Sequence, residues 1–471
     1  MKLKHKELQI DSVNPFENCK LDRRKYAMVL TNIVGKYSDG FVLALNNEWG
    51  TGKTTFVKMW QQELNLEGYP NLYFNAWEND YEANPLVALM AELKELITPE
   101  NREKAEKKYK ALLAKGAVIT KSVLPHLMKA LAIRYFGHEA VGELIGDTAQ
   151  GSTEIFEQEV KEYNNKKEGL KEFKQRLSDF VKEAKEEKPI VFIIDELDRC
   201  RPNYAVELLE QIKHFFSIEG IVFVLSIDKL QLGHAVRGVY GNDRINADEY
   251  LRRFIDIEYS LPIPDPKLFC TYLYDYFELN DFFTGDRQYK YGFHNERENV
   301  IEITTILFKI SNATLRQQEK VFAHARLGLI GFREDHYVFP ELYLILVFIR
   351  TFHCEYYLRI RLKQLNYEEL LSGFKQCMPK EIDDYNVRFF IKMEALLLYL
   401  YYASRKDHSN KQLIEKTKEA NKDKVIVKSC FEKSEDDPIF IEFVKDFLRN
   451  YSPLTIDHIL NRIDLIEQVI E

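Results

Sequence analysis

The chain has 471 residues, of which 45% are hydrophobic and 30% are charged, and its formal net charge is −8. These proportions are typical of a folded globular protein, and the length predicts two or three domains rather than a single core. The acidic balance argues against a surface that is basic throughout, so nucleic-acid binding is a minority hypothesis.

The first 80 residues predict alternating helices and strands. Apolar residues recur at helical spacing over 21–36, and the apolar run 41–45 after Gly40 is typical of a buried strand. A second helical pattern covers 56–64, and residues 72–77 form the next predicted strand. The predicted order is therefore helix, strand, helix, strand.

A long segment without strand signals comes next, and we expect a helical insertion at about 86–188. Two further strands are predicted at 190–194 and 221–225, with a helix at about 203–216 between them. Continuous apolar runs that alternate with helices are typical of a parallel sheet covered on both faces. The sequence therefore predicts an α/β fold with a three-layer parallel sheet.

The proline cluster at 262–266 marks the predicted domain boundary. We expect an α/β domain over 1–265, which contains the insertion, and a helical C-terminal domain over 266–471. Residues 406–424, rich in Lys and Asn, are expected to form an exposed loop or a solvated helix.

Targeting and membrane segments are not predicted. No apolar stretch follows the basic first residues, so we do not expect a secretory signal. The longest apolar runs, Leu342 to Ile349 and Ala395 to Ala403, are shorter than the ~18 residues that a membrane span needs. The six cysteines lie far apart and are expected to be reduced thiols. We expect a cytoplasmic protein without a membrane span.

The polar loop after the first predicted strand has the composition of a phosphate-binding loop. Its residues are Asn47, Glu48, Trp49, Gly50, Thr51, Gly52, Lys53, Thr54 and Thr55. Because the loop joins a strand to a helix, its backbone N–H groups and the helix N-terminus can cradle phosphates. Lys53 is expected to reach the β- and γ-phosphates of ATP, and Thr54 to give its hydroxyl to Mg²⁺. The alternative is a glycine turn before an ordinary helix.

Three positions decide how well this loop fits the usual phosphate-loop pattern. Gly50 and Gly52 allow the backbone to approach phosphates closely because they have no Cβ. Asn47 stands where the pattern has its first glycine. Asparagine tolerates positive φ better than other non-glycine residues, so we expect the loop to tolerate this departure.

Two adjacent carboxylates, Asp195 and Glu196, follow the third predicted strand. They stand at its carboxyl end, where open α/β sheets bind ligands. Asp195 is expected to orient the Mg²⁺ shell through water, and Glu196 to polarise the attacking water as a general base. The alternative is a solvated strand end, which a phosphate loop in the same sheet disfavours.

Four further residues have two interpretations each. Asp228 follows the fourth predicted strand and is expected either to sense the γ-phosphate or to cap the next helix. Arg252 and Arg253 are candidates for an arginine finger that acts on a neighbouring subunit, or for surface salt bridges. Arg316 begins a helix beyond the boundary and is expected either to read the nucleotide state or to be solvated.

Together these motifs resemble the KAP-type P-loop NTPases, which place an extra strand between the phosphate loop and the Asp-Glu strand. The resemblance rests on Trp49 to Thr54, Phe74 to Trp77, Asp195 to Cys200 and Tyr250-Leu251, which together span about 25–265. Their joint order is more specific than any one of them.

The resemblance implies an ATPase that uses ATP and Mg²⁺, with helices between the two nucleotide motifs. In many relatives these helices span a membrane, whereas here they are too polar, which suggests a soluble branch. Soluble bacterial members are often associated with defence against phage. Many relatives carry a second aspartate where this chain has Glu196, and the glutamate favours ordinary hydrolysis.

The leading hypothesis is an ATPase switch that self-associates and controls a separate effector protein. The sequence of 266–471 contains no nuclease, protease or deaminase constellation, so the effector is expected to be another chain. A third hypothesis is a scaffold that binds ATP without turnover, and Glu196 argues against it. The choice between ATP and GTP stays open because no base-reading motif is recognisable.

The runner-up is a nucleic-acid motor or clamp, for which the sequence offers a basic and aromatic stripe. The stripe consists of Arg350, Phe352, Tyr356, Tyr357, Arg359, Arg361 and Lys363. Such residues can hold single strands through phosphate contacts and stacking. The same pattern also fits a buried helix face with solvated arginines.

Overall fold

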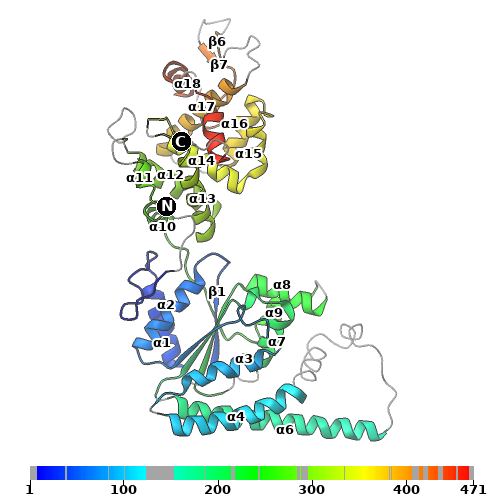
Figure 1. Ribbon diagram of the computed structural model, residues 1–471. Helices are drawn as coiled ribbons and strands as arrows, with labels where there is room; N and C mark the ends of the chain where they lie inside the picture. Colours follow the sequence, from blue (N-terminus) through cyan, green and yellow to red (C-terminus); the bar gives the residue numbers. More distant parts are fainter. Residues whose placement is uncertain are drawn as a thin grey trace. The chain divides into compact units, whose positions relative to one another are not determined.

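The computed structural model forms two compact units, Leu8–Ile263 and Pro264–Glu471, which are described separately (Figure 1). The described residues are 8–37, 40–82, 84–99, 101–122, 153–185, 187–213, 218–241, 244–283, 287, 295–333, 335–380, 382, 384–405, 413–416, 423–432, 439–451 and 454–465. The predicted insertion therefore lies partly outside the described residues, as does the predicted loop over 406–424. The division between the units lies inside the proline cluster.

The first unit contains a five-stranded parallel sheet, which confirms the predicted fold class. Its strands are β1 (Phe41–Asn46), β2 (Asn71–Asn75), β3 (Ile190–Asp195), β4 (Ile221–Ile227) and β5 (Ile257–Tyr259). The order across the sheet is β2-β3-β4-β1-β5, with every pairing parallel. The central strands β3, β4 and β1 are apolar and buried on both faces, as their continuous apolar runs predict.

Helices cover both faces of this sheet. One face carries α1 (Arg24–Lys36) and α2 (Lys53–Leu66), which pack on side chains such as Val191, Ile193 and Val224. The other face is covered by α3 (Pro85–Glu92), α7 (Pro202–Lys213), α8 (Lys229–Tyr240) and α9 (Ala247–Leu251). Phe192 and Ile194 point to this second face because neighbouring side chains of a strand alternate. The result is the predicted three-layer arrangement.

The predicted strand over 72–77 ends earlier than expected. Strand β2 stops at Asn75, whose side-chain Oδ1 accepts hydrogen bonds from the backbone N–H groups of Trp77 (3.1 Å) and Glu78 (3.3 Å). This side-chain bonding closes a turn directly after the strand. Strand β5 was not predicted, because its three residues lie at the sheet edge and none is fully buried.

The described part of the insertion, between β2 and β3, is helical. After α3 and the short 3₁₀ helix η1 (Leu93–Leu96), the helices α4 (Arg102–Ser122) and α6 (Thr153–Ala184) lie side by side (Figure 1). Their contact is apolar, and Tyr109 packs on Phe180 with ring centroids 5.8 Å apart. Within the described ranges, the structure contains no helix long and apolar enough to cross a membrane.

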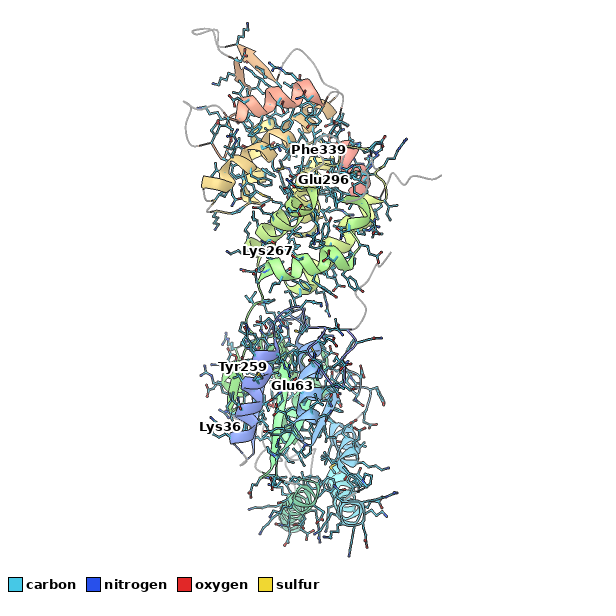
Figure 2. All side chains as sticks on the ribbon, turned by 90° about the vertical axis from the view of Figure 1, so that its left-hand side faces the viewer. Lys36, Glu63, Tyr259, Lys267, Glu296 and Phe339 are labelled. Atoms are coloured by element: carbon cyan, nitrogen blue, oxygen red, sulfur yellow. The ribbon has the colours of Figure 1, made fainter. Side chains whose placement is uncertain are left out.

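The second unit is mainly helical. Its helices are α10 (Pro266–Tyr276), α11 (Asn280–Phe283), α12 (Glu296–Ser311), α13 (Leu315–Leu329), α14 (Pro340–Phe352), α15 (Cys354–Arg361), α16 (Tyr367–Gln376), α17 (Asp384–Ser404), α18 (Ile439–Asn450) and α19 (Asp457–Ile463). Glu296, labelled in Figure 2, forms a fully buried ion pair with Arg287 at 2.7 Å. The short strands β6 (Ile414–Lys416) and β7 (Asp423–Val425) pair antiparallel, so the expected loop or solvated helix over 406–424 is wrong where it is described.

Candidate functional site

The sheet order brings the two predicted motifs together. Strand β1, which feeds the loop over 47–52, pairs with β4, and β4 pairs with β3, which ends in Asp195. Asp195 lies directly opposite Ser226, and Asn46 lies opposite Ile227. Segments about 150 residues apart in the sequence therefore meet at the carboxyl edge of one sheet, which is where parallel sheets bind ligands.

The loop between β1 and α2 has the backbone shape of a phosphate cradle. Gly50 and Gly52 have φ values of 82° and 80°, a left-handed conformation that side chains with a Cβ rarely adopt. The Thr51 hydroxyl donates to the carbonyl oxygen of Glu48 at 2.8 Å and closes the loop from inside. Gly52 is the N-cap of α2 and has no capping side chain, so the N-terminus of α2 stays available for an anion.

A buried arginine that the motif analysis did not identify supports this loop from the side of α1. The guanidinium of Arg23 donates to the carbonyl oxygens of Thr51 (2.9 Å) and Gly52 (3.3 Å). Arg23 is only 4% exposed, and burial lowers its pKa. Because it binds the loop carbonyls, Arg23 fixes the peptide planes whose N–H groups are expected to face the phosphates.

Asn47 does not adopt the positive φ that was expected to make asparagine acceptable at this position. Asn47 is not among the described non-glycine residues with positive φ, so the tolerance of asparagine for that conformation is not used. Its side-chain amide instead pairs with the backbone of Leu261. The Asn47 Nδ2 donates to the Leu261 carbonyl, the Leu261 N–H donates to the Asn47 Oδ1, and both distances are 2.9 Å.

Lys53 is a buried cation in acidic surroundings. Its Nζ donates to the carbonyl oxygens of Asn47 and, at 3.1 Å, of Glu48. Burial lowers the pKa of Lys53, and the carboxylates of Asp198, Asp228 and Asp195 oppose this shift. An ammonium group held by loop carbonyls can exchange them for phosphate oxygens.

Asp195 is buried and held in place by two donors. Its Oδ2 accepts a hydrogen bond from the Tyr73 hydroxyl at 3.0 Å, and its Oδ1 accepts one from the Glu196 N–H at 3.0 Å. Burial and the Asp195 charge raise the pKa of Tyr73, so the phenol stays protonated and can donate. Thr54, the other expected Mg²⁺ ligand, follows Lys53 in the first turn of α2 and is partly buried.

Glu196 is in a left-handed conformation, with φ 60° and ψ 25°. Its Oε1 forms an ion pair with Arg199 at 2.6 Å, and its Oε2 accepts a hydrogen bond from the Asn75 amide at 3.3 Å. Burial raises the pKa of Glu196, while the charge of Arg199 opposes the rise. A carboxylate with a raised pKa is a better proton acceptor near neutral pH, once it is free to reach a water molecule.

Asp198 and Arg199, which follow Glu196, add to the site; the sequence suggested Arg199 only as a cation near Glu196 and did not suggest Asp198. Asp198 is buried and accepts a hydrogen bond from the indole Nε1 of Trp49, which joins the loop to the segment after β3. Burial raises the pKa of Asp198. Arg199 lies over the ring of Trp77, 5.7 Å from its centroid. Both belong to the segment from Asp195 to Cys200, which carries the family resemblance.

At the tip of β4, the structure places Asp228 as a helix cap. Its Oδ1 accepts hydrogen bonds from the N–H groups of Leu230 (3.1 Å) and Gln231 (3.3 Å) at the start of α8. The capping interpretation of Asp228 describes its geometry, while its charge still acts on Lys53. The hydroxyl of Ser226 is buried and, among the described atoms, has no hydrogen-bond partner.

The three predicted arginines lie on the surface. Arg252 is 71% exposed and forms an ion pair with Glu249 at 3.6 Å, and Arg253 is also exposed. Arg316 is exposed in the first turn of α13 and belongs to the unit Pro264–Glu471. The structure therefore groups none of them with the loop and the carboxylates within the first unit.

The basic stripe of the runner-up hypothesis is neutralised within the second unit. Arg350 pairs with Asp464 (3.3 Å), Arg359 with Glu369 (3.2 Å), Arg361 with Asp457 (3.0 Å) and Asp464 (3.1 Å), and Lys363 with Asp457 (2.6 Å). The Tyr357 hydroxyl is bonded to Asp464 at 2.9 Å. Cations and rings that are engaged in this way are poorly placed to bind phosphates and bases.

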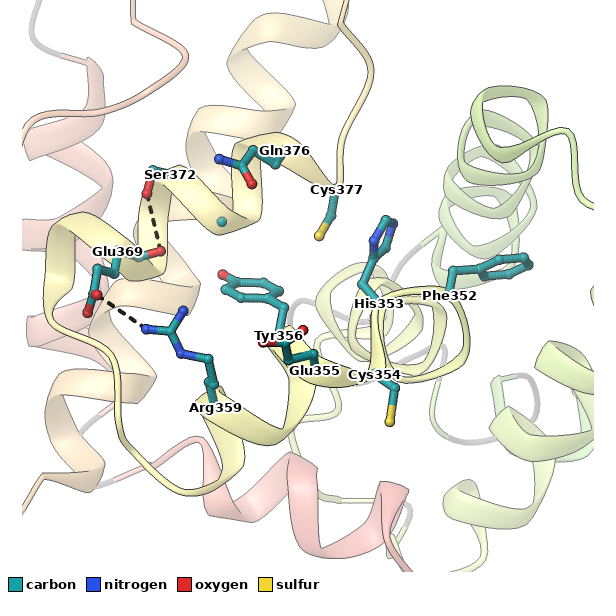
Figure 3. A pocket seen from close by; sticks show the side chains of 11 residues that line it. Phe352, His353, Cys354, Glu355, Tyr356, Arg359, Glu369, Ser372, Gln376 and Cys377 are labelled. Carbon is teal, nitrogen blue, oxygen red and sulfur yellow. Dashed lines mark hydrogen bonds and ion pairs between the residues drawn. The ribbon is translucent and has the colours of Figure 1, made fainter.

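A pocket of about 510 Å³ between α15 and α16 contains a histidine and two cysteines (Figure 3). Burial raises the pKa of the Cys377 thiol to about 12 and lowers the pKa of His353, which disfavours a thiolate–imidazolium pair. Arg359 and Glu369 bind each other across one side of the pocket. The thiol of Cys377 is therefore held in its neutral, weakly nucleophilic form.

Comparison with known proteins adds the family. The description "KAP family P-loop domain" matches residues 23–281, more than half of the chain. Among solved structures, the chain is similar to the Aeropyrum pernix ORC2 protein in its ADPNP–ADP complexes, with 14% identity and a TM-score of 0.32, over 91% of this chain and 95% of that chain. None of the curated proteins matches the chain. Since the match over 23–281 includes both motifs at the sheet edge, the chain belongs to the KAP family of P-loop NTPases.

Proposed function

We propose that the chain binds Mg·ATP at the carboxyl edge of the parallel sheet and hydrolyses its terminal phosphoanhydride bond. The observation that carries this proposal is the position of Lys53. Its buried ammonium group is held by the carbonyls of a glycine-containing loop and is surrounded by the carboxylates of Asp195, Asp198 and Asp228. Such a cation is placed to accept a polyphosphate chain, whose oxygens can replace the loop carbonyls.

The residues present suit both the phosphates and a magnesium ion. The left-handed Gly50 and Gly52 leave the cradle open where a Cβ would fill it, and the loop N–H groups supply donors. Thr54 and Asp195 would hold Mg²⁺, because hydroxyl and carboxylate oxygens are its usual protein ligands. When bound, the ion would neutralise charge on the phosphate oxygens.

Glu196 is proposed as the general base. The carboxylate would take a proton from water while the water oxygen bonds to the γ-phosphorus and the bond to the bridging oxygen breaks, releasing ADP and phosphate. Lys53 would stabilise the charge that develops on the phosphate oxygens. Asn75, which contacts Glu196 at 3.3 Å, would orient the carboxylate.

Calorimetric titration of the purified chain with Mg·ATP, Mg·GTP and Mg·ADP, together with an assay of phosphate release, tests this proposal. We expect binding of at least one triphosphate and slow release of phosphate. Absence of binding to all three nucleotides would contradict the assignment of the site. The GTP titration also decides the base preference, which the sequence leaves open.

We further propose that nucleotide state controls self-association and thereby a separate effector protein. The supporting observation is that Arg252 and Arg253 are exposed directly after the buried pair Tyr250 and Leu251. Exposed arginines that directly follow buried residues are placed so that one of them can reach the nucleotide of a neighbouring subunit. Phage defence is a proposal that rests on the resemblance alone.

A scaffold that binds ATP without turnover is the second candidate. The ion pair between Glu196 and Arg199 favours it, because a tied carboxylate cannot accept a proton from water. Phosphate release from ATP distinguishes the two candidates, when it is measured for the purified chain alone and for the chain mixed with the product of a neighbouring gene. Turnover in either condition supports the ATPase, whereas binding without any turnover supports the scaffold.

A further inference from the structure

Arg199 pairs with the proposed base, and Asp198, the residue before it, is bonded to Trp49 of the phosphate loop. Arg199 ends the short 3₁₀ helix η2 (Leu197–Arg199), and its NH1 lies 2.6 Å from the Oε1 of Glu196. Its side chain is 25% exposed, so it is not locked inside the core. The guanidinium also lies over the half-exposed ring of Trp77, at 5.7 Å from the centroid.

The backbone next to Arg199 is tied to the loop that carries Lys53. Trp49, four residues before Lys53, donates its indole N–H to Asp198, which directly precedes Arg199. A guanidinium beside the loop can add its attraction to that of Lys53 for an anion that binds there. In the structure, Glu196 provides the negative charge that holds Arg199 nearby.

We propose that Arg199 is a movable cation that holds Glu196 when no triphosphate is bound and turns to the γ-phosphate when ATP binds. The turn frees the Glu196 carboxylate to accept the proton from water, and it adds a positive charge to the transferred group. This inference deepens the proposed function and rests on it. It assigns Arg199 a direct contact with the substrate.

Competition between two anions drives this exchange. A γ-phosphate carries more negative charge than a carboxylate and offers several acceptor oxygens, so it competes well for a guanidinium. ADP has no γ-phosphate, and Arg199 therefore stays with Glu196 when ADP is bound. The proposal thus links release of the base to the presence of the bond that is to be cleaved.

Binding measurements test the proposal without relying on turnover. The affinities of Mg·ADP and of the non-hydrolysable ATP analogue with an imido β–γ bridge are measured for wild type, Arg199→Ala and Arg201→Ala. Arg201 is a matched control, because it lies two residues away, is 61% exposed and pairs with Asp80 at 3.6 Å. We expect Arg199→Ala to weaken the imido analogue by about tenfold and to leave ADP unchanged, because a charge-assisted hydrogen bond is lost. Arg201→Ala should change neither affinity.

A double-mutant cycle addresses the exchange itself. Glu196→Gln removes the charge that competes for Arg199, so it should tighten binding of the imido analogue several-fold. In the Arg199→Ala background the same change should have no effect, because no guanidinium is left to be released. Additive effects of the two substitutions would overturn the proposed exchange.

Tryptophan fluorescence supplies a second readout of the position of Arg199. The chain has three tryptophans, and the signal of Trp77 is obtained as the difference between wild type and Trp77→Phe. The Trp77 signal should change when the imido analogue binds but not when ADP binds. In Arg199→Ala, the imido analogue should no longer change the Trp77 signal. If Arg199→Ala fails to fold, Arg199→Lys and Arg199→Gln replace it, with partial and full loss of the effect expected.

The outcomes separate this inference from the proposed function. If wild type binds neither nucleotide, the phosphate site itself is wrongly assigned. If wild type binds both nucleotides and Arg199→Ala keeps the wild-type ratio of their affinities, the site stands and the role of Arg199 is overturned.

Discussion

At the residue scale, Asn47 stands where the motif has a glycine, and its side chain forms a contact that glycine cannot form. Its amide exchanges two hydrogen bonds with the Leu261 backbone, so the start of the phosphate loop is tied to the segment that follows β5. Leu261 lies shortly before the end of the first unit at Ile263. The loop is therefore anchored by a contact that a glycine cannot make.

We predict that Asn47→Gly destabilises the protein although it restores the usual motif. The substitution leaves the Leu261 N–H and carbonyl without their partner, which costs about 1–3 kcal/mol. Urea unfolding monitored by circular dichroism gives the free energy of unfolding. Asn18→Gly, which removes one exposed bond to Gln9, is the control for backbone entropy and should cost less. Equal stability of both variants would show that the Leu261 contact contributes nothing.

Lys53 gives the simplest test of the site. We expect Lys53→Ala to abolish triphosphate binding or weaken it severely, because it removes the side-chain cation that the loop directs at the β- and γ-phosphates. Isothermal titration calorimetry measures the affinity. Lys58→Ala, one turn and a half further along α2, is a control that should bind normally. Unchanged affinity in Lys53→Ala would contradict the placement of the phosphates.

Glu196→Gln should separate binding from hydrolysis. The amide keeps the shape of the side chain but cannot accept the proton of water, so phosphate release should fall about 10²- to 10⁴-fold while triphosphate still binds. Single-turnover phosphate release and calorimetry are measured on the same sample. Loss of both binding and folding would instead assign Glu196 a structural role.

At the scale of elements, a buried carboxylate joins α17 to the loop that precedes α18. Glu394 is fully buried and accepts hydrogen bonds from the Ser429 hydroxyl and from the Cys430 N–H at 2.8 Å. Ser429 in turn accepts the N–H groups of Phe431 and Glu432, each at 3.1 Å. Burial raises the pKa of Glu394 to about 7. Burial therefore favours the protonated form, although the hydrogen bonds from Ser429 and Cys430 oppose the shift.

This shift predicts a pH dependence of stability. Because the folded state raises the pKa of Glu394, its stabilising contribution is complete below the unfolded value of about 4.3 and is lost as pH rises through about 7. The loss between these limits is on the order of 3 kcal/mol. We expect Glu394→Gln to be more stable than wild type at pH 8 and to show no such gain at pH 5. Urea midpoints at both pH values measure this difference, and exposed Glu368→Gln is the control. A gain that is equal at both pH values would contradict the assignment.

At the scale of the whole molecule, the question is which cations complete the site. Among the described residues of the first unit, Arg199 pairs with Glu196 and Lys53 is held by the phosphate loop, while Arg252 and Arg253 lie on the surface. An arginine from a neighbouring subunit is worth about 10³ to 10⁵ in rate where it has been measured. Self-association promoted by ATP would bring such an arginine to the site.

We predict that Arg252→Ala or Arg253→Ala lowers turnover much more than nucleotide affinity, and that wild-type specific activity rises with protein concentration. Mixing either variant with Lys53→Ala should restore some activity, because each chain contributes the part that the other lacks. Arg333→Ala, a 70% exposed arginine of the second unit, serves as the control. Phosphate release and analytical ultracentrifugation are the measurements. A concentration-independent rate from a strictly monomeric, fully active enzyme would return both arginines to surface salt bridging.

The sequence by itself determined the α/β class, the central strands and the positions of the two motifs. These features are local, because each depends on a continuous apolar run or on a few adjacent residues such as Gly50 to Thr54 or Asp195 and Glu196. It also placed the extra strand between the motifs, although β2 ends at Asn75 rather than at Trp77. Strand β5 escaped prediction, since a three-residue edge strand has no apolar run of its own.

Only the tertiary structure decided how the charged groups are paired. The Asn47 amide meets Leu261 across 214 residues, and Trp49 meets Asp198 across 149, so no spacing rule could reveal these contacts. In the sequence, the basic stripe beginning at Arg350 fits a nucleic-acid site. In the structure, Asp457 and Asp464, about a hundred residues later, form ion pairs with its arginines. The sequence shows which residues are charged. Whether a charged side chain is free to bind a ligand depends on the partners that the fold places beside it.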